Sequence, residues 1–533
     1  MSNATSKPTA AASPGPVPKD WIAGLKENAR FDLMAGFIIF LIALPLSLGI
    51  AIASGFPPIA GLVTAVIGGM LGALISGSHV TINGAAAGLI AICFGAVTAL
   101  GLDPATGQVD MIAGFRYALA VGVVCGVLQI AMGLARMGKL TNMFPLNVVH
   151  GMLAGIGVII MAKQIHLALG VSVSGDMIKT IAAIPSSFAG MNQNVALIGL
   201  ISLVIMIVWP RMGKITKFVP APLVVVLAAV PLGMFFGLDK KYLVQVPLNI
   251  AEAFAMPDWG KVNTGVFWKF VVTYMFVASL ESLLTAAAMD KMDPWKRRSN
   301  MNQELIGKGA ANALSSFIGG LPMIAEVVRS SANIMNGART RWSNFFHGVF
   351  ILVAVAALPA VLNMIPLAAL AGMLVFIGFR LAHPKEFVHA AHTGKEELFY
   401  MVATTVIVVA VDLLWGVIAG FALAVLVNAM RGVRSAKAQA RVKADGDNLR
   451  LELQGAHGFL NYVSMRGQLD ALPPGKKLTI DYSGVSYMDH TVHERFHDFD
   501  GEYAQTGGSV STVGREHLKP LSGSDVAALA ARA

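Results

Sequence analysis

The stretch GGLPMIAEVVRSSANIMNGA, residues 319–338, places an acid, Glu326, three residues before a base, Arg329, in an otherwise small and apolar run. Long hydrophobic segments flank it on both sides. Ionisable groups in such surroundings are costly unless they pair with one another or with a ligand. Whether Glu326 and Arg329 pair with each other or bind a ligand therefore depends on the structure around them.

The whole chain is unusually apolar. Of its 533 residues, 55% are hydrophobic and only 13% are charged, and the mean hydropathy is +0.66. Runs of about 20 apolar residues recur over the first 430 positions, and each is long enough to cross a ~30 Å hydrocarbon layer. The sequence therefore predicts a polytopic α-helical membrane protein.

We predict fourteen spans in two sets of seven. The first set falls at 31–54, 57–76, 84–101, 112–134, 146–168, 195–213 and 219–237. The second set falls at 264–290, 302–318, 325–337, 344–363, 366–383, 396–412 and 413–430. Because seven is odd, the second set is expected to be inverted relative to the first, and fourteen crossings place both termini on one side.

Basic residues indicate that this side is the cytoplasm. With the N-terminus inside, the short inner loops carry Arg136, Lys139, Arg211, Lys214, Lys217, Lys291, Lys296, Arg297, Arg298, Arg339 and Arg341. The outer loop 101–111 has two acids and no base, as the positive-inside rule expects. The net charge of +10 therefore reflects membrane topology, and we expect no nucleic-acid partner. The expected location is an inner membrane that faces the cytoplasm.

Composition also predicts the domain boundaries. Residues 1–30 are expected to form a disordered cytoplasmic tail, 31–237 the first repeat, 264–432 the second repeat and 444–533 a cytoplasmic domain. In that last domain, 449–455 and 476–489 are typical of strands, and 490–508 is typical of a helix with Val492, Phe496 and Phe499 on one face.

A second segment is built like the opening stretch. SGSHVTINGAAAGLIAI (76–92) and IGGLPMIAEVVRSSANI (318–334) each begin with a Gly-containing break, continue as an extended piece (79–83 and 321–325) and enter a helix of small residues. Each is the third span of its set. Paired broken helices are typical of secondary transporters with a midplane site, and their two N-termini attract an anion. The alternative is two Gly-rich packing kinks.

Several motifs resemble one family of membrane proteins. ASLESLLTAAAMDK (278–291), NQELIGKGAANALSSFIGGLP (302–322) and VRSSANIMNGARTRWSNFFHG (328–348) resemble the bacterial sulfate permease (SulP) family, which is related to the solute carrier family 26 anion exchangers. LPLSLGIAIASGFPPIAGLVTAVIGGMLGALISGS (44–78) resembles its first two helices. The tail KKLTIDYSGVSYMDHTVHERFHDF (476–499) resembles its C-terminal STAS domain.

The resemblance implies a seven-plus-seven inverted repeat, with spans 1–4 and 8–11 as a core domain and spans 5–7 and 12–14 as a gate domain. It also implies an anion site between the starts of spans 3 and 10, near the middle of span 1. Carried onto this chain, that site comprises Pro45, Leu46, Ser47, Gly84, Ala85, Ala86, Ala87, Glu326, Val327, Val328 and Arg329. Sodium-coupled bicarbonate members hold the cation with an acid and a Thr on span 8, and Glu281 and Thr285 match those positions.

The residues themselves leave alternatives open. Glu281 is an intramembrane carboxylate with Thr285 on the same helix face, which favours a cation or proton role; alternatively, it is a buried acid that hydrogen-bonds the backbone of a broken helix. Glu326 is a protonatable coupling acid beside an anion-holding Arg329, or half of an internal salt bridge. His493 and His497 have metal-ligand spacing, but we interpret them as a solvated helix face.

We therefore predict a secondary active transporter of small inorganic anions, sulfate or bicarbonate, by H+- or Na+-coupled symport. No ATP-binding loop or catalytic motif occurs, so we expect neither an enzyme nor a cofactor beyond the coupling ion, and no metal beyond Na+ at Glu281 and Thr285. The alternatives are a nucleobase–proton symporter, an anion channel, and a STAS-based sensor or scaffold. The expected partners are a small inorganic anion, the lipid membrane and a second copy, in a homodimer to which the STAS domain contributes.

Overall fold

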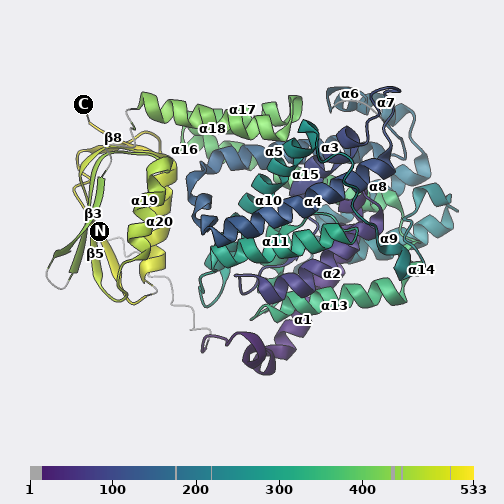
Figure 1. Ribbon diagram of the computed structural model, residues 1–533, viewed down its shortest axis with the longest axis horizontal. Helices are drawn as coiled ribbons and strands as arrows, with labels where there is room; N and C mark the ends of the chain where they lie inside the picture. Colours follow the sequence, from purple (N-terminus) through teal and green to yellow (C-terminus); the bar gives the residue numbers. More distant parts are fainter. Residues whose placement is uncertain are drawn as a thin grey trace.

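The computed structural model describes residues 15–173, 177–217, 219–431, 433, 439–445, 448–504 and 506–532. A large body of helices lies beside a smaller domain that contains a sheet and carries the C-terminus (Figure 1). The first helix begins at Trp21, so the expected disordered tail is too long at its C-terminal end. Residues 1–14 of that tail lie outside the described residues.

Each predicted span contains a helix. In the first set these are α1 (Trp21–Ala53), α2 (Pro58–Ile75), the short η1 (Ala87–Leu89) with α3 (Ile90–Leu100), α4 (Met111–Leu134), α5 (Leu146–Ala168), α8 (Gln193–Val208) and α9 (Ala221–Phe235). In the second set they are α10 (Gly265–Met292), α11 (Met301–Phe317), α12 (Val327–Met335), α13 (Trp342–Ala357), α15 (Leu367–Leu381), α17 (Lys395–Ala410) and α18 (Leu413–Met430).

Within the described residues, eight helices are long and apolar enough to cross a membrane, and three shorter ones are also apolar. The count of fourteen crossings therefore stays a prediction. The connections contain short helices that the sequence did not indicate, namely η2 (Met137–Met143), α6 (Met177–Ala182), α7 (Ile184–Ala189), η4 (Gly213–Lys217), η5 (Lys240–Tyr242), η6 (Ile250–Ala253) and α16 (Pro384–Thr393). Two further short helices, η3 (Trp209–Arg211) and α14 (Pro359–Leu362), lie near the ends of predicted spans.

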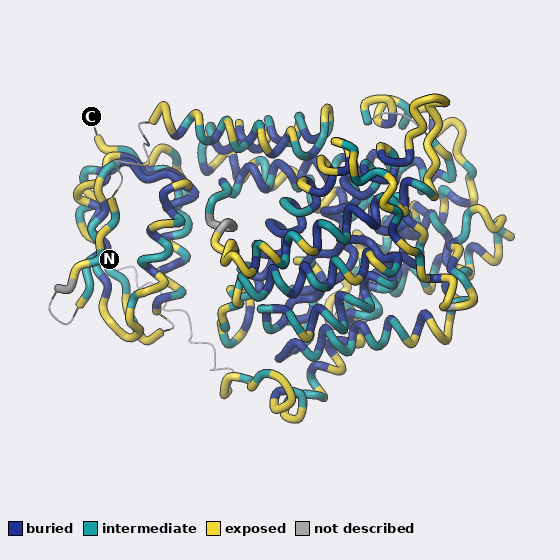
Figure 2. The backbone as a smooth tube through the Cα atoms, in the orientation of Figure 1, coloured by how far each residue is buried: buried dark blue, intermediate teal, exposed yellow. Residues whose placement is uncertain are grey.

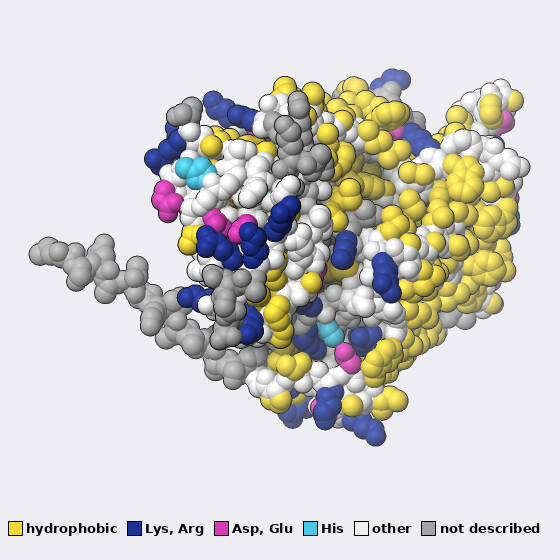
Figure 3. Space-filling view, turned by 60° about the vertical axis from the view of Figure 1, so that its left-hand side comes forward, with side chains coloured by type: hydrophobic (Ala, Val, Ile, Leu, Met, Phe, Trp, Pro, Cys, Tyr) yellow, Lys and Arg dark blue, Asp and Glu magenta, His cyan; other side chains and the backbone are white. Residues whose placement is uncertain are grey.

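The helices pack mainly within two groups. Helices α1, α2, α4, α10, α11 and α13 contact one another, while α5, α8, α15, α17 and α18 form the second group. Small residues allow close approach, because a Cβ on Gly126 of α4 would lie 2.4 Å from the backbone nitrogen of Ala313 on α11. Buried residues fill the interior (Figure 2), and hydrophobic side chains cover a broad area of the outer surface (Figure 3), as a lipid-facing surface requires.

The C-terminal domain is an α/β domain. Its sheet has the order β3 (Gln439–Asp445), β4 (Asn448–His457), β5 (Lys477–Met488), β8 (Leu529–Ala531) and β7 (Leu518–Pro520), with β6 (Ser509–Val513) also on β5. Strands β4 and β5 are parallel, with Leu451 opposite Ile480. Helices α19 (Phe459–Asp470) and α20 (His490–Ala504) complete it. Val492, Phe496 and Phe499 are buried on α20, as predicted, and the domain is consistent with a STAS domain.

This domain contacts both helix groups. Lys291 at the end of α10 pairs with Asp498 at 2.5 Å, and Arg298 in the next connection pairs with Glu502 at 3.1 Å. On the other group, Asn428 of α18 donates a hydrogen bond to the Asp489 side chain at 3.3 Å. Ser522 also donates one to the carbonyl oxygen of Thr393, in the adjoining α16, at 2.6 Å. The C-terminal domain therefore spans the boundary between the two groups.

Candidate functional site

The two broken helices meet through their extended pieces. Strand β1 (Asn83–Gly84) pairs antiparallel with β2 (Ile324–Ala325), with Asn83 opposite Ala325 and Gly84 opposite Ile324. This pairing confirms the extended segments expected in the third span of each set. It also counts against two independent packing kinks, because unrelated kinks have no reason to share a strand pair.

Neighbouring helices supply partners for the remaining backbone groups of these segments. Side-chain oxygens accept hydrogen bonds from backbone nitrogens in four pairs: Thr64 from Leu321 at 2.7 Å, Asn312 from Met323 at 2.6 Å, Ser282 from Ala325 at 3.3 Å and Ser330 from Ile82 at 2.9 Å. Unwound backbone at membrane depth is tolerated only where protein or enclosed water satisfies it. The polar residues in these apolar helices therefore stabilise the break itself.

Arg329 joins the two half-helices. Its side chain is 1% exposed, and its Nη2 donates a hydrogen bond to the Ala85 carbonyl oxygen at 2.9 Å. Its Nε and Nη1 are buried and have no hydrogen-bond partner among the described residues. Gly84 permits this approach, since a Cβ there would lie 3.0 Å from Nη1. The guanidinium thus retains two unused donors between the starts of spans 3 and 10.

Glu326 is the N-cap of α12. Its carboxylate accepts a hydrogen bond from the backbone nitrogen of Arg329 at 2.7 Å, while the Arg329 Nε lies 3.9 Å from the same oxygen. The contact with the guanidinium is therefore looser than a hydrogen-bonded salt bridge, whose N–O distances are about 2.7–2.9 Å. The acid satisfies a backbone N–H that the helix start would otherwise leave unpaired.

The other predicted substrate residues differ in their exposure. Ala85, Ala86 and Ala87 are buried, and so are Pro45, Leu46 and Ser47 in the middle of α1. Val327 and Val328 are 48% and 40% exposed. We call the place where the starts of α3 and α12 meet the junction. The start of α12 is therefore its more exposed side. The substrate roles of all these residues stay predictions.

Two features of α1 suit a polar site. Pro45 has no N–H, so the carbonyl oxygen of Leu41 loses its helical donor. The Ser47 hydroxyl is buried with no hydrogen-bond partner in the described part of the chain. The Leu41 carbonyl and the Ser47 hydroxyl lie near the middle of α1, the helix that the resemblance places beside the two broken helices.

Glu281 lies against the start of span 3. A Cβ on Gly88 would lie 2.2 Å from Glu281 Oε2, and Glu281 Oε1 is buried without a hydrogen-bond partner among the described residues. That finding gives no support to the alternative in which this acid hydrogen-bonds the backbone. Thr285, one turn further along α10, is 1% exposed. The two residues thus offer oxygen atoms at a buried place beside the half-helix.

Sequence reasoning missed a buried ion pair on span 9. Lys308 Nζ lies 2.6 Å from Glu304 Oε1, and both side chains are 0% exposed. Lys308 also donates a hydrogen bond to the side chain of Asn83, and Glu304 accepts from the backbone nitrogens of Gly77 at 3.0 Å and Ser78 at 3.2 Å. The pair therefore fixes both ends of the segment that leads into β1. An acid and a base four residues apart in an apolar span were the available signal.

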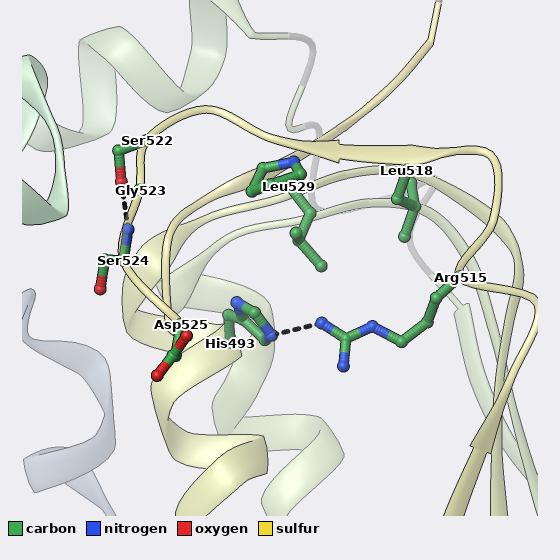
Figure 4. Close-up of a pocket in the computed structure, with 9 residues that line it drawn as sticks. His493, Arg515, Leu518, Ser522, Gly523, Ser524, Asp525 and Leu529 are labelled. Atoms are coloured by element: carbon green, nitrogen blue, oxygen red, sulfur yellow. Dashed lines mark hydrogen bonds between the residues drawn. The ribbon is translucent and has the colours of Figure 1, made fainter. Parts of the chain in front are cut away.

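A separate cavity of about 350 Å³ lies in the C-terminal domain (Figure 4). There His493 Nε2 accepts a hydrogen bond from Arg515 at 2.9 Å, and its Nδ1 lies 2.7 Å from the Ala527 carbonyl oxygen. Burial lowers the pKa of His493. The prediction of a solvated face is therefore wrong for His493, although His497 is exposed. The described residues contain no cluster of three metal-ligating side chains.

Comparisons with known proteins agree with this architecture. The Sulfate permease family matches residues 30–404. The chain is 30% identical over 406 residues to the "Putative sulfate transporter YvdB" of Bacillus subtilis, covering 75% of this chain and 73% of that protein. The structure of the transmembrane domain of a cyanobacterium bicarbonate transporter, BicA, superposes with a TM-score of 0.64 at 27% identity, covering 73% of this chain and 97% of that one.

A longer likeness concerns the fold alone. The murine Solute Carrier 26 family member A9 anion transporter, in its inward-facing state, gives a TM-score of 0.67 at 17% identity, covering 93% of this chain and 86% of that one. This likeness extends over the C-terminal domain as well as the membrane helices.

Proposed function

The chain belongs to the sulfate permease family, a family of transporters rather than enzymes, and we propose that it carries sulfate or bicarbonate by secondary active symport. Relatives of this chain include a putative sulfate transporter and bicarbonate transporters. Both anions are small oxyanions that present two or more oxygen atoms on one side. A guanidinium edge matches that arrangement with two parallel N–H donors.

The observation that carries the proposal is the position of Arg329. A buried cation with Nε and Nη1 unpaired among the described residues lies where two half-helices begin. Leaving such donors unsatisfied is unfavourable, whereas a charged hydrogen bond contributes about 1.5–3 kcal/mol. An oxyanion at this place would accept a charged hydrogen bond from one of these donors and would lie near the positive ends of α3 and α12.

The coupling ion is assigned to the carboxylates. Glu281 and Thr285 offer oxygen ligands of the kind that a hard cation such as Na+ prefers, and Glu281 or Glu326 would instead take up a proton. Since Glu281 lies against Gly88, its charge is close to the start of span 3. A cation or proton there would offset the negative charge that arrives with the anion.

Orientation and assembly complete the proposal. We propose that both termini face the cytoplasm of a bacterium, with the chain in the inner membrane, and the basic residues of the predicted inner loops support this orientation. We expect a homodimer to which the C-terminal domain contributes. A nucleobase–proton symporter would also use carboxylates on spans 8 and 10, but a buried arginine with free donors favours an anion over a neutral base. A channel or a STAS-based sensor leaves the buried Glu281 without a role.

Counterflow in proteoliposomes tests the function. Purified protein is reconstituted with unlabelled anion inside, and uptake of labelled sulfate, bicarbonate, fumarate or uracil is followed with and without imposed Na+ and H+ gradients. We expect counterflow of sulfate or bicarbonate and concentrative uptake with one of the two gradients. Uptake of uracil alone, or anion flux that no gradient can concentrate, would contradict the proposal.

A further inference from the structure

A second cavity, of about 260 Å³, shares no lining residue with the proposed anion site. Four parts of the chain form its walls: the start of α1, the segment between α2 and β1, the connection before α11 and the residue before α13. The polar and aromatic residues that line it include Asp20, Trp21, Ser76, His79, Arg298 and Arg341. Arg298 also pairs with Glu502, so the cavity opens on the side of the membrane helices that carries the C-terminal domain.

Arg341 is the buried cation of this cavity. It is 7% exposed, and its Nη1 donates a hydrogen bond to the Ser76 carbonyl oxygen at 2.9 Å. The Trp21 ring covers the guanidinium at 4.8 Å. Nevertheless its Nε is buried with no hydrogen-bond partner within the described residues. A stacked guanidinium with an unsatisfied edge is the usual arrangement for recognising a planar or tetrahedral anion.

The chain supplies an anion of its own there. Asp20 lies with one carboxylate oxygen 3.3 Å from His79 Nδ1 and 3.9 Å from Arg341 Nη2. The hydrogen bond from His79 lowers the pKa of Asp20, so the group is ionised at neutral pH. Both distances are longer than the ~2.7–2.9 Å of a good charge-assisted hydrogen bond. Asp20 therefore occupies the cavity with one long hydrogen bond to His79 and leaves Nε of Arg341 unpaired among the described residues.

We propose that this cavity is a second anion site, built for a phosphate group, in which the Asp20 carboxylate is a resident competitor. A phosphate group offers three or four acceptor oxygens where a carboxylate offers two, so it can contact the Arg341 edge, His79 and Arg298 together. The group can come from inorganic phosphate or from a lipid headgroup. Ser76 and His79 belong to the segment that leads into β1. A ligand in this cavity would therefore contact the segment just before the strand that carries Gly84.

The test measures binding, not transport. Full-length protein is purified with Arg329→Ala in every variant, which silences the transport site that we propose above. Labelled inorganic phosphate is then titrated by equilibrium dialysis into this parent, into Asp20→Asn and into Glu27→Gln. Glu27 is a matched control, because it is a nearby acid of α1 that pairs with Lys19 at 2.6 Å and does not line the cavity. We expect Asp20→Asn to bind phosphate about tenfold more tightly, as removal of a charged competitor predicts.

A second arm identifies the source of the phosphate group. The same variants are reconstituted in nanodiscs containing phosphatidic acid or only phosphatidylcholine, and co-purifying lipid is counted by native mass spectrometry. Retention of phosphatidic acid by Asp20→Asn above the Glu27→Gln control, with weak binding of free phosphate, would assign a lipid headgroup. The reverse result would assign the free ion.

Two further variants test whether the other cavity residues take part in binding. Adding His79→Gln or Arg298→Gln to Asp20→Asn removes one contact each, and we expect each to reverse most of the gain in affinity. If Asp20→Asn gains neither phosphate nor phosphatidic acid over Glu27→Gln, or if the gain survives both added substitutions, Asp20 is only a structural contact of the tail and the site does not exist.

Discussion

Arg329 of α12 donates a hydrogen bond to the carbonyl oxygen of Ala85, 2.9 Å away, and so connects the broken helix of one repeat to that of the other. The same guanidinium keeps two unpaired donors. One side chain therefore connects the two half-helices and keeps charged, unpaired donors between them. Its removal is expected to affect binding more strongly than helix formation, because β1 and β2 still pair.

Replacing Arg329 by alanine should abolish specific anion binding in a folded protein. Loss of a buried, charge-assisted contact costs about 2–5 kcal/mol, which is well over tenfold in affinity. Arg329→Lys keeps the charge but lacks the planar fork, so we expect intermediate affinity. The measurement is equilibrium binding of labelled anion to purified protein, with Arg339→Gln as a control outside the junction. Near-normal uptake by a well-folded Arg329→Ala protein would remove this residue from the site.

Glu281→Gln should separate transport from coupling. The amide keeps the shape of the side chain but neither carries the charge that holds Na+ nor exchanges a proton at neutral pH. We expect loss of accumulation against a gradient, with exchange of anion for anion retained. Uptake is compared with that of Glu252→Gln, an exposed acid in the connection before α10. Concentrative uptake by Glu281→Gln, still dependent on the same ion gradient, would exclude Glu281 from coupling.

The buried pair on α11 predicts a stability effect. Lys308→Ala leaves Glu304 as an uncompensated charge that is 0% exposed, and breaking such a pair typically costs about 3–5 kcal/mol. The double change Lys308→Met with Glu304→Gln removes both charges and should recover part of that loss. Thermal unfolding in detergent compares the three proteins. Equal stability of the single and double variants would mean that the pair is not coupled.

The sequence could predict those features of the structure that depend on residues close together along the chain, but not contacts between distant residues. Span positions follow from the length of apolar runs, a local property, and α5 and α18 lie at the predicted residues. The N-cap role of Glu326 was less accessible, because helix starts shift by a residue or two in any sequence-based reading. The contact of Lys308 with Asn83 joins residues 225 positions apart. No local pattern encodes such a contact, so only the folded chain reveals it.

The C-terminal domain should lose stability in alkaline solution through His490. Burial alone would lower the pKa of this histidine, but its hydrogen bond to Glu494 and the charge of Glu397 raise it to about 9. Because the folded-state pKa lies above the ordinary histidine value of about 6.5, the stabilisation is complete below about pH 6.5 and is lost as pH rises through about 9. The shift corresponds to roughly 3 kcal/mol.

Thermal unfolding of the full-length protein between pH 6.5 and 9.5 checks this expectation. Wild type should lose a few degrees over that range. Glu494→Gln removes the hydrogen-bonded carboxylate 3.2 Å from His490 and should flatten the profile, while Glu516→Gln, an exposed acid elsewhere in the domain, should follow wild type. A Glu494→Gln profile that still falls as steeply as wild type would assign the alkaline loss to another group.

A carboxylate beside the proposed anion site is unexpected, and we expect protonation of Glu326 to account for it. In the empty protein its carboxylate caps α12 through the Arg329 backbone nitrogen and lies 3.9 Å from the guanidinium. An arriving anion would compete for the same cation and repel the carboxylate, so we expect Glu326 to take up a proton as the anion binds. Anion affinity of the wild type should then rise as pH falls, because protons and anion bind together.

Glu326→Gln mimics the protonated acid and should bind anion tightly, with little dependence on pH near neutrality. Glutamine keeps an oxygen that can accept from the Arg329 backbone nitrogen, so the start of α12 is retained while the charge is lost. Glu326→Ala loses both, and comparing the two variants separates the charge from the cap. The measurement is anion binding to purified protein at several pH values. If Glu326→Gln keeps the wild-type dependence on pH, or binds anion more weakly at every pH, Glu326 is a structural cap and the proton belongs to another group.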